Sequence, residues 1–80
     1  MDITNDKIKN VNQLEFAIFC IENVADALSA DPQRVYRAIA EESDVLYNYI
    51  LPEYEMLHTL SKEYIVADIL EVMSEKSVAV

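Results

Sequence analysis

The chain contains no glycine, and only two of its 80 residues are proline. Tight turns and β-hairpins depend on residues with positive φ, a conformation that glycine adopts most readily. Helices joined by short capped connections need few such residues. Because 52% of the residues are hydrophobic, the chain is also too apolar for a disordered segment. The composition therefore predicts an all-α fold.

Eighty residues supply one hydrophobic core, so we expect a single domain over residues 1–80. Its ordered part is predicted at about residues 11–75, with a frayed N-terminus and a loose tail from Ser77 to Val80. The single cysteine, Cys20, excludes an internal disulfide and is typical of a reducing compartment. No signal-peptide pattern is present, and no apolar run approaches the roughly 20 residues that span a bilayer. We therefore expect a cytoplasmic protein without membrane contact.

The net charge is −9, from fifteen acidic and six basic residues. Such a chain repels phosphate, so binding to nucleic acid or to anionic membranes is disfavoured. The charge favours a soluble protein with a basic partner.

The first predicted helix begins at Val11. Apolar residues recur there at steps of three and four along one face: Leu14, Ala17, Ile18, Ile21, Val24, Ala25 and Leu28. Phe19 instead projects among acidic residues on the opposite face, and Phe16 lies at the flank of the stripe. Either another helix covers this side, or Phe19 anchors a protein contact. The second alternative makes Phe16, Phe19 and Glu22 the candidate interface.

Three further helices are predicted, which gives a bundle of about four. Asp31 and Pro32 begin the second helix, and Ser61 caps the last, over residues 62–75. The third helix, residues 45–58, should kink or break at Pro52, with Leu51 displaced from the α region. The predicted core comprises Leu14, Ile18, Ile21, Val35, Ile39, Leu57, Ile65 and Ile69.

Residues 24–39 are similar to a DNA-binding helix-turn-helix, in which Gln33, Arg34 and Arg37 would face a groove. Ser29 replaces the usual turn glycine, and the net charge is wrong for phosphate. A DNA-binding regulator is therefore the alternative function rather than the preferred one.

No catalytic machinery is visible in the sequence. Glu55 and His58 share a helix face, as in di-metal bundles, but one histidine per chain would require a symmetric dimer to complete such a site. A histidine bonded to a carbonyl or a tyrosine at a turn is the preferred interpretation, and the five tyrosines are expected mainly in core packing. A nucleophile–base pair, a glycine-rich phosphate loop and a CxxC motif are all missing. We expect no enzyme, no cofactor, no metal and no small-molecule substrate.

Two blocks of sequence carry a resemblance to a known family. The first is Leu14-Glu15-Phe16-Ala17-Ile18-Phe19-Cys20-Ile21-Glu22, and the second, more specific one extends from Tyr49 to Ile69. With them the chain resembles a bacterial family called domain of unknown function 3791, although Leu60-Ser61 replaces a connection that often carries a glycine. The residues of the second block whose role is unknown are Tyr49, Pro52, Tyr54, Glu55, His58, Thr59, Tyr64 and Asp68.

The family has no established activity, so the resemblance transfers no catalytic residue. Its members often lie beside genes of a second family that looks like ADP-ribosyltransferases, which implies a small acidic, antitoxin-like partner protein. Together with the charge and Phe19, this favours a non-enzymatic protein–protein interaction module. Self-association as a homodimer is the second possibility.

Overall fold

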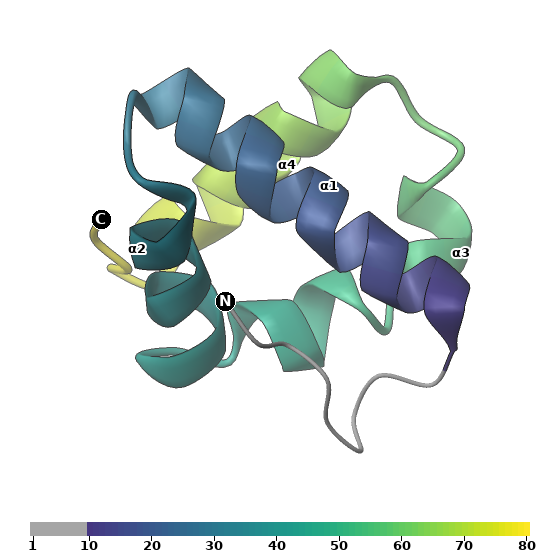
Figure 1. Cartoon of the computed structure of the whole chain (residues 1–80), viewed down its shortest axis with the longest axis horizontal. Helices are drawn as coiled ribbons and strands as arrows, with labels where there is room; N and C mark the ends of the chain where they lie inside the picture. Colours follow the sequence, from purple (N-terminus) through teal and green to yellow (C-terminus); the bar gives the residue numbers. More distant parts are fainter. Residues whose placement is uncertain (1–9) are drawn as a thin grey trace.

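The computed structural model describes residues 10–80, which form a bundle of helices (Figure 1). α1 (Val11–Leu28) packs against both α2 (Pro32–Tyr36) and α4 (Lys62–Glu75). A π-helical turn, η1 (Arg37–Glu41), continues α2, and a second one, η2 (Leu46–Ile50), precedes the short helix α3 (Tyr54–Leu57). No strand occurs in this part of the chain. The predicted all-α bundle of about four helices is confirmed, with η2 and α3 as its interrupted third member.

Side-chain caps define the ends of the helices. The Asn10 side chain accepts a hydrogen bond from the Gln13 N–H at 2.9 Å, and Asp31 accepts one from the Gln33 N–H at 2.8 Å. Ser29 ends α1 in the left-handed conformation, with φ 53°. The following Ala30 N–H then reaches back to the Ala25 carbonyl at 2.9 Å. A serine thus makes the left-handed cap that glycine makes more readily, and the chain turns directly into α2.

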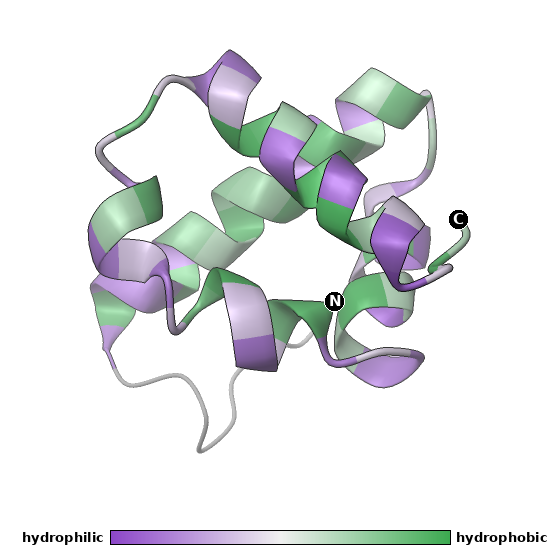
Figure 2. Cartoon of the chain, turned by 180° about the vertical axis from the view of Figure 1, so that it is seen from behind, coloured by the Kyte–Doolittle hydropathy of each residue, from purple (hydrophilic) through white to green (hydrophobic). Residues whose placement is uncertain are grey.

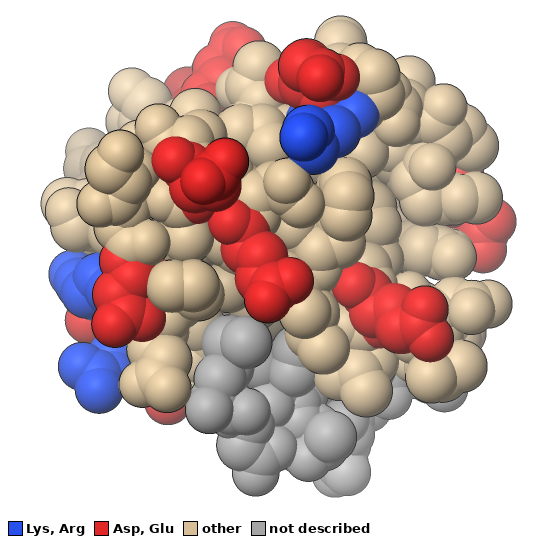
Figure 3. Space-filling model, turned by 45° about the horizontal axis from the view of Figure 1, so that its top comes forward, with Lys and Arg blue, Asp and Glu red and all other residues tan. Residues whose placement is uncertain are grey.

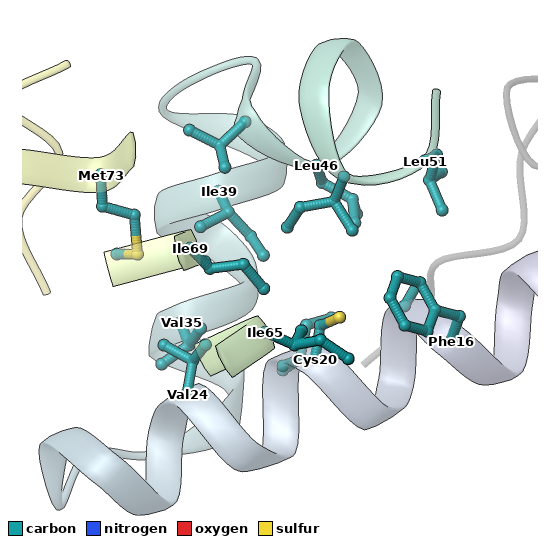
Figure 4. Packing of buried hydrophobic residues seen from close by; sticks show 14 of the residues in the cluster. Phe16, Cys20, Val24, Val35, Ile39, Leu46, Leu51, Ile65, Ile69 and Met73 are labelled. Atoms are coloured by element: carbon teal, nitrogen blue, oxygen red, sulfur yellow. The ribbon is translucent and has the colours of Figure 1, made fainter. Parts of the chain in front are cut away.

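The core lies between α1, the α2–η1 segment, η2 and α4 (Figure 4). Six of the predicted core residues are buried: Ile21, Val35, Ile39, Leu57, Ile65 and Ile69. Leu14 and Ile18 are half-buried and pack against the edge of this core. The buried face of α1 is rotated toward Phe16 and Cys20, because Tyr54 of α3 packs on that flank. Figure 2 shows hydrophobic and hydrophilic residues side by side along the helices, as expected for faces that are buried on one side.

The interruption at Pro52 is confirmed, but not its expected cause. Leu51 keeps α-helical angles, with φ −71° and ψ −42°, so the prediction that proline displaces it was wrong. Its N–H bonds to the Leu46 carbonyl five residues back, at 3.0 Å, which makes the turn wider than an α turn. A proline clashes with the carbonyl four residues before it in a regular helix, here that of Asn48. The wider turn accommodates the ring, and the helix resumes at Tyr54.

The C-terminal tail, which was predicted to be loose, folds back onto the bundle. Ser77 has φ 58°, and the Val78 N–H donates to the Met73 carbonyl at 2.8 Å. The guanidinium of Arg34 donates to the Ala79 carbonyl at 3.3 Å. The predicted fraying of the N-terminus concerns residues 1–9, which lie outside the described residues.

None of the helices between residues 10 and 80 combines the length and the hydropathy that crossing a membrane requires.

Candidate functional site

Four ring side chains form a row that joins the two blocks of the resemblance. Phe19 and Phe16 of α1 stack with their ring centroids 6.1 Å apart, and Phe16 meets the edge of Tyr54 at 5.3 Å. Tyr54 in turn stacks on His58 at 4.6 Å with an interplanar angle of 15°. We call Phe19, Phe16, Tyr54 and His58 the aromatic row. The row packs α3 against α1, and this packing accounts for the positions of the four rings.

The candidate interface on α1 is reduced by this packing. Phe16 is only 8% exposed and belongs to the core, Phe19 is half-buried beside it, and Glu22 is exposed. The short helix α3 therefore covers Phe16 through Tyr54, whereas Phe19, to which the two alternatives referred, is only half-buried. Helical periodicity predicts on which side of a helix a residue lies. It does not predict which neighbouring element covers that side. Of the candidate interface, Phe19 is thus partly exposed and Glu22 is exposed.

A second cluster joins η2 to α4. The Tyr49 hydroxyl donates a hydrogen bond to the carboxylate of Asp68, and both side chains are partly buried. This hydrogen bond, together with burial and the negative charges of Asp68 and Glu53, raises the pKa of Tyr49 above its ordinary value of 10.0. Tyr49 is thus a protonated donor at neutral pH and a structural tie between two helices.

The remaining motif residues lie on the surface. Pro52 follows η2, and the Thr59 hydroxyl donates to the Met56 carbonyl at 2.7 Å, beyond the end of α3. Glu55 and His58 are exposed, and no group of three or more His, Cys, Asp or Glu side chains able to hold a metal ion occurs among residues 10–80. Tyr64 is 57% exposed and Met56 is 51% exposed. The expectation of core packing therefore fits the other tyrosines but not Tyr64.

In the helix-turn-helix segment, the guanidinium of Arg34, a candidate for phosphate contact, is already bound to other residues of the chain. Arg34 forms an ion pair with Glu42 at 2.9 Å, in addition to its hydrogen bond to the tail. Gln33 and Arg37 are exposed, as a DNA reader would require. Since Glu42 and the tail hold Arg34, its charge is partly compensated before any phosphate approaches.

Two adjoining hollows lie on the outside of the bundle, beside α1 and α4. The first, which we call the α1–α4 groove, has a volume of about 320 Å³ and is lined by Asn23, Asp26, Ala27, Lys62, Glu63, Val66, Ala67 and Leu70. The second, the tail hollow, has about 470 Å³ and is lined by Leu28, Ala30, Leu70, Met73, Ser74, Val78 and Val80. Leu70 lines both, so the two hollows adjoin at this residue.

Sequence reasoning missed this surface. Val66 and Leu70 of α4 pack against the core with one side and remain partly exposed with the other. The available signal was the pair of alanines, Ala27 and Ala67, on helix flanks that are otherwise polar. That signal is weak, because only the packing of α1 against α4 brings the two alanines to one groove.

Acidic groups dominate the exposed charge beside the groove. In Figure 3 several acidic groups cross the face of the molecule in the direction that α1 takes in Figure 1. The exposed acidic residues of α1 are Glu15, Glu22 and Asp26. The face that carries the groove is therefore electronegative.

Together these features define a small all-α bundle with an electronegative surface and an apolar groove between its two longest helices. The chain belongs to the family described as a protein of unknown function (DUF3791), whose model matches residues 15–76 and thus includes the aromatic row and the Tyr49–Asp68 pair. No curated protein and no solved structure was found to match the chain.

Proposed function

We propose that the chain is a non-enzymatic protein–protein interaction module. The observation that carries this proposal is the pair of adjoining hollows, the α1–α4 groove and the tail hollow, which are lined largely by apolar residues. Leu28 and Val80, which line the tail hollow, are 40% and 42% exposed. Apolar concave surfaces rimmed by polar groups are typical of sites that another macromolecule covers.

The finer proposal concerns the kind of partner. The net charge of −9 favours a basic protein surface, since opposite potentials steer association and suppress wrong partners. The gene neighbourhood implied by the resemblance makes an ADP-ribosyltransferase-like protein a candidate, with this chain as its antitoxin-like partner in the cytoplasm. The gene neighbourhood is the observation that supports this part of the proposal.

DNA binding is the second candidate function. It is favoured by the short connection from α1 to α2 and by the exposure of Gln33 and Arg37. The ion pair of Arg34 with Glu42 and the net charge oppose it. Homodimer formation is opposed by the charge as well, because two copies would bring like charges together.

Co-purification from the native host, with identification of bound proteins by mass spectrometry, tests the proposal. Ala67→Glu places a bulky charged side chain in the α1–α4 groove and should abolish recovery of the partner. Val11→Glu makes the same change in charge at a residue that is 62% exposed and does not line the groove, so it should have no effect. Recovery of the wild-type chain as a lone monomer would remove the interaction function.

A further inference from the structure

We propose that the α1–α4 groove binds an amphipathic helix with basic residues along its flanks. This inference rests on the proposed interaction function and names the class of partner that the groove accepts. Three properties of the groove carry it: a floor of small and aliphatic side chains, acidic residues on both walls, and continuation into a second apolar hollow.

The floor of the groove is suited to the apolar face of a helix. Ala27 of α1 and Ala67 of α4 leave little side chain between the two backbones, so a third helix can approach closely. Val66 and Leu70 supply aliphatic surface that is already half-buried, and covering the remainder removes apolar area from water. Since Leu70 also lines the tail hollow, the apolar floor extends beyond the groove itself.

The walls of the groove are mainly acidic. Asp26 lines it from α1 and Glu63 lines it from α4, while Lys62 is the one cation among the lining residues. Glu22 lies one helical turn before Asp26, and Glu71 lies one turn after Ala67 on the same side of α4. A bound helix therefore has carboxylates on either side, and lysine or arginine at its flanking positions would complement them.

Other occupants fit less well. A second copy of this chain would bring a further net charge of −9 to a face that is already acidic. Nucleic acid would bring phosphates to the same carboxylates. A peptide that binds by adding a strand would need a free strand edge, whereas residues 10–80 contain no strand. A helix laid into a groove between two helices satisfies its own backbone hydrogen bonds and presents only side chains.

Two designed helical peptides of 18 residues test the inference, and both carry the same leucine stripe. The flanking positions are lysine in one peptide and glutamate in the other. Titration of the isotope-labelled full chain, followed by amide NMR shifts, should show saturable binding of the lysine peptide only. The shifted amides should cluster in residues 22–28 and 62–71.

Two double variants with the same change in net charge distinguish binding in the groove from nonspecific electrostatic attraction to the chain. Asp26→Lys with Glu63→Lys should weaken binding of the lysine peptide at least tenfold. Glu15→Lys with Glu41→Lys changes the net charge equally at exposed residues that do not line the groove, and should weaken binding less than about threefold. Circular dichroism should show both double variants folded.

Equal weakening by the two double variants would overturn the proposal, because general charge attraction would then explain binding. Shifts that cluster outside the groove, or no saturable shift with the lysine peptide, would overturn it too. If a partner from the host still binds the Asp26→Lys, Glu63→Lys chain, the groove is not the binding site, but the chain is still an interaction module. Failure of this inference is thus distinguishable from failure of the proposed function.

Discussion

At the scale of single residues, Tyr49 connects η2 to α4 through its hydrogen bond to Asp68. Tyr49→Phe removes the hydroxyl and leaves a partly buried carboxylate without this donor. We expect the free energy of unfolding to fall by about 1–2 kcal/mol, measured by urea denaturation. Tyr64→Phe removes a hydroxyl from a residue that is 57% exposed and should change stability by less than about 0.5 kcal/mol. Equal effects of the two variants would show that the Tyr49–Asp68 pair is not a structural tie.

The same pair has a consequence at high pH. The pKa of Tyr49 is higher in the folded chain than its ordinary value of 10.0, so the folded state holds this proton more tightly. Its contribution to stability is complete below about pH 10 and is lost as the pH rises through the folded-state pKa. The wild-type chain should therefore lose stability above pH 10 more steeply than Tyr49→Phe. Parallel stability profiles of the two proteins would contradict the assignment.

Cys20 is the chain's one thiol and lies fully buried on α1. Burial raises the pKa of Cys20 to about 12, and only the thiolate is a good nucleophile. We expect Ellman's reagent at about pH 8 to react slowly with the native chain and at once with the chain in guanidinium chloride. Rapid labelling of the native chain would mean that α1 is not packed as the structure has it.

At the scale of helical elements, the end of α1 depends on the left-handed conformation of Ser29. A residue with a Cβ atom pays a steric cost there that glycine does not. Ser29→Gly should raise the free energy of unfolding by about 0.5–1 kcal/mol. Ala67→Gly, inside α4, should lower it by about 1 kcal/mol. Thermal unfolding followed by circular dichroism checks both signs, and a destabilised Ser29→Gly chain would contradict the cap.

The two phenylalanines of α1 should differ in their effect on stability. Phe16 is 8% exposed, so Phe16→Ala should cost about 3–5 kcal/mol and largely unfold a small domain. Phe19 is half-buried, so Phe19→Ala should cost clearly less and leave a folded chain. If Phe19→Ala unfolds the chain as readily as Phe16→Ala, Phe19 is a core residue rather than a binding residue. Urea denaturation of the two variants decides this.

The helices also show which structural features can be predicted from the sequence. Periodicity predicted a helix that begins at Val11, and the Ser61 cap predicted one over residues 62–75, because these signals are local. The break at Pro52 was predicted for the same reason. The rotation of the buried face of α1 was not, since it depends on Tyr54 packing from a distant part of the chain. The groove was missed as well, because Ala27 and Ala67 become neighbours only through the packing of α1 against α4.

At the scale of the whole molecule, the net charge of −9 separates the two candidate functions. A DNA-binding protein depends on cations that displace counterions from phosphates, and its affinity falls steeply with salt. We expect no specific binding above background to the promoter of the gene that encodes this chain, at about physiological ionic strength. A footprint there that disappears with Arg34→Ala and Arg37→Ala would reverse the preference for a protein partner.

The central claim, that a partner protein covers the α1–α4 groove, is tested most directly by carboxylate footprinting of the complex recovered from the host. Carbodiimide labels exposed carboxylates, and mass spectrometry measures the labelling of each. We expect labelling of Asp26 and Glu63 to fall severalfold in the complex, while Glu15 and Glu41 are labelled as in the free chain. Protection at Glu41 with unchanged labelling of Asp26 and Glu63 would contradict it.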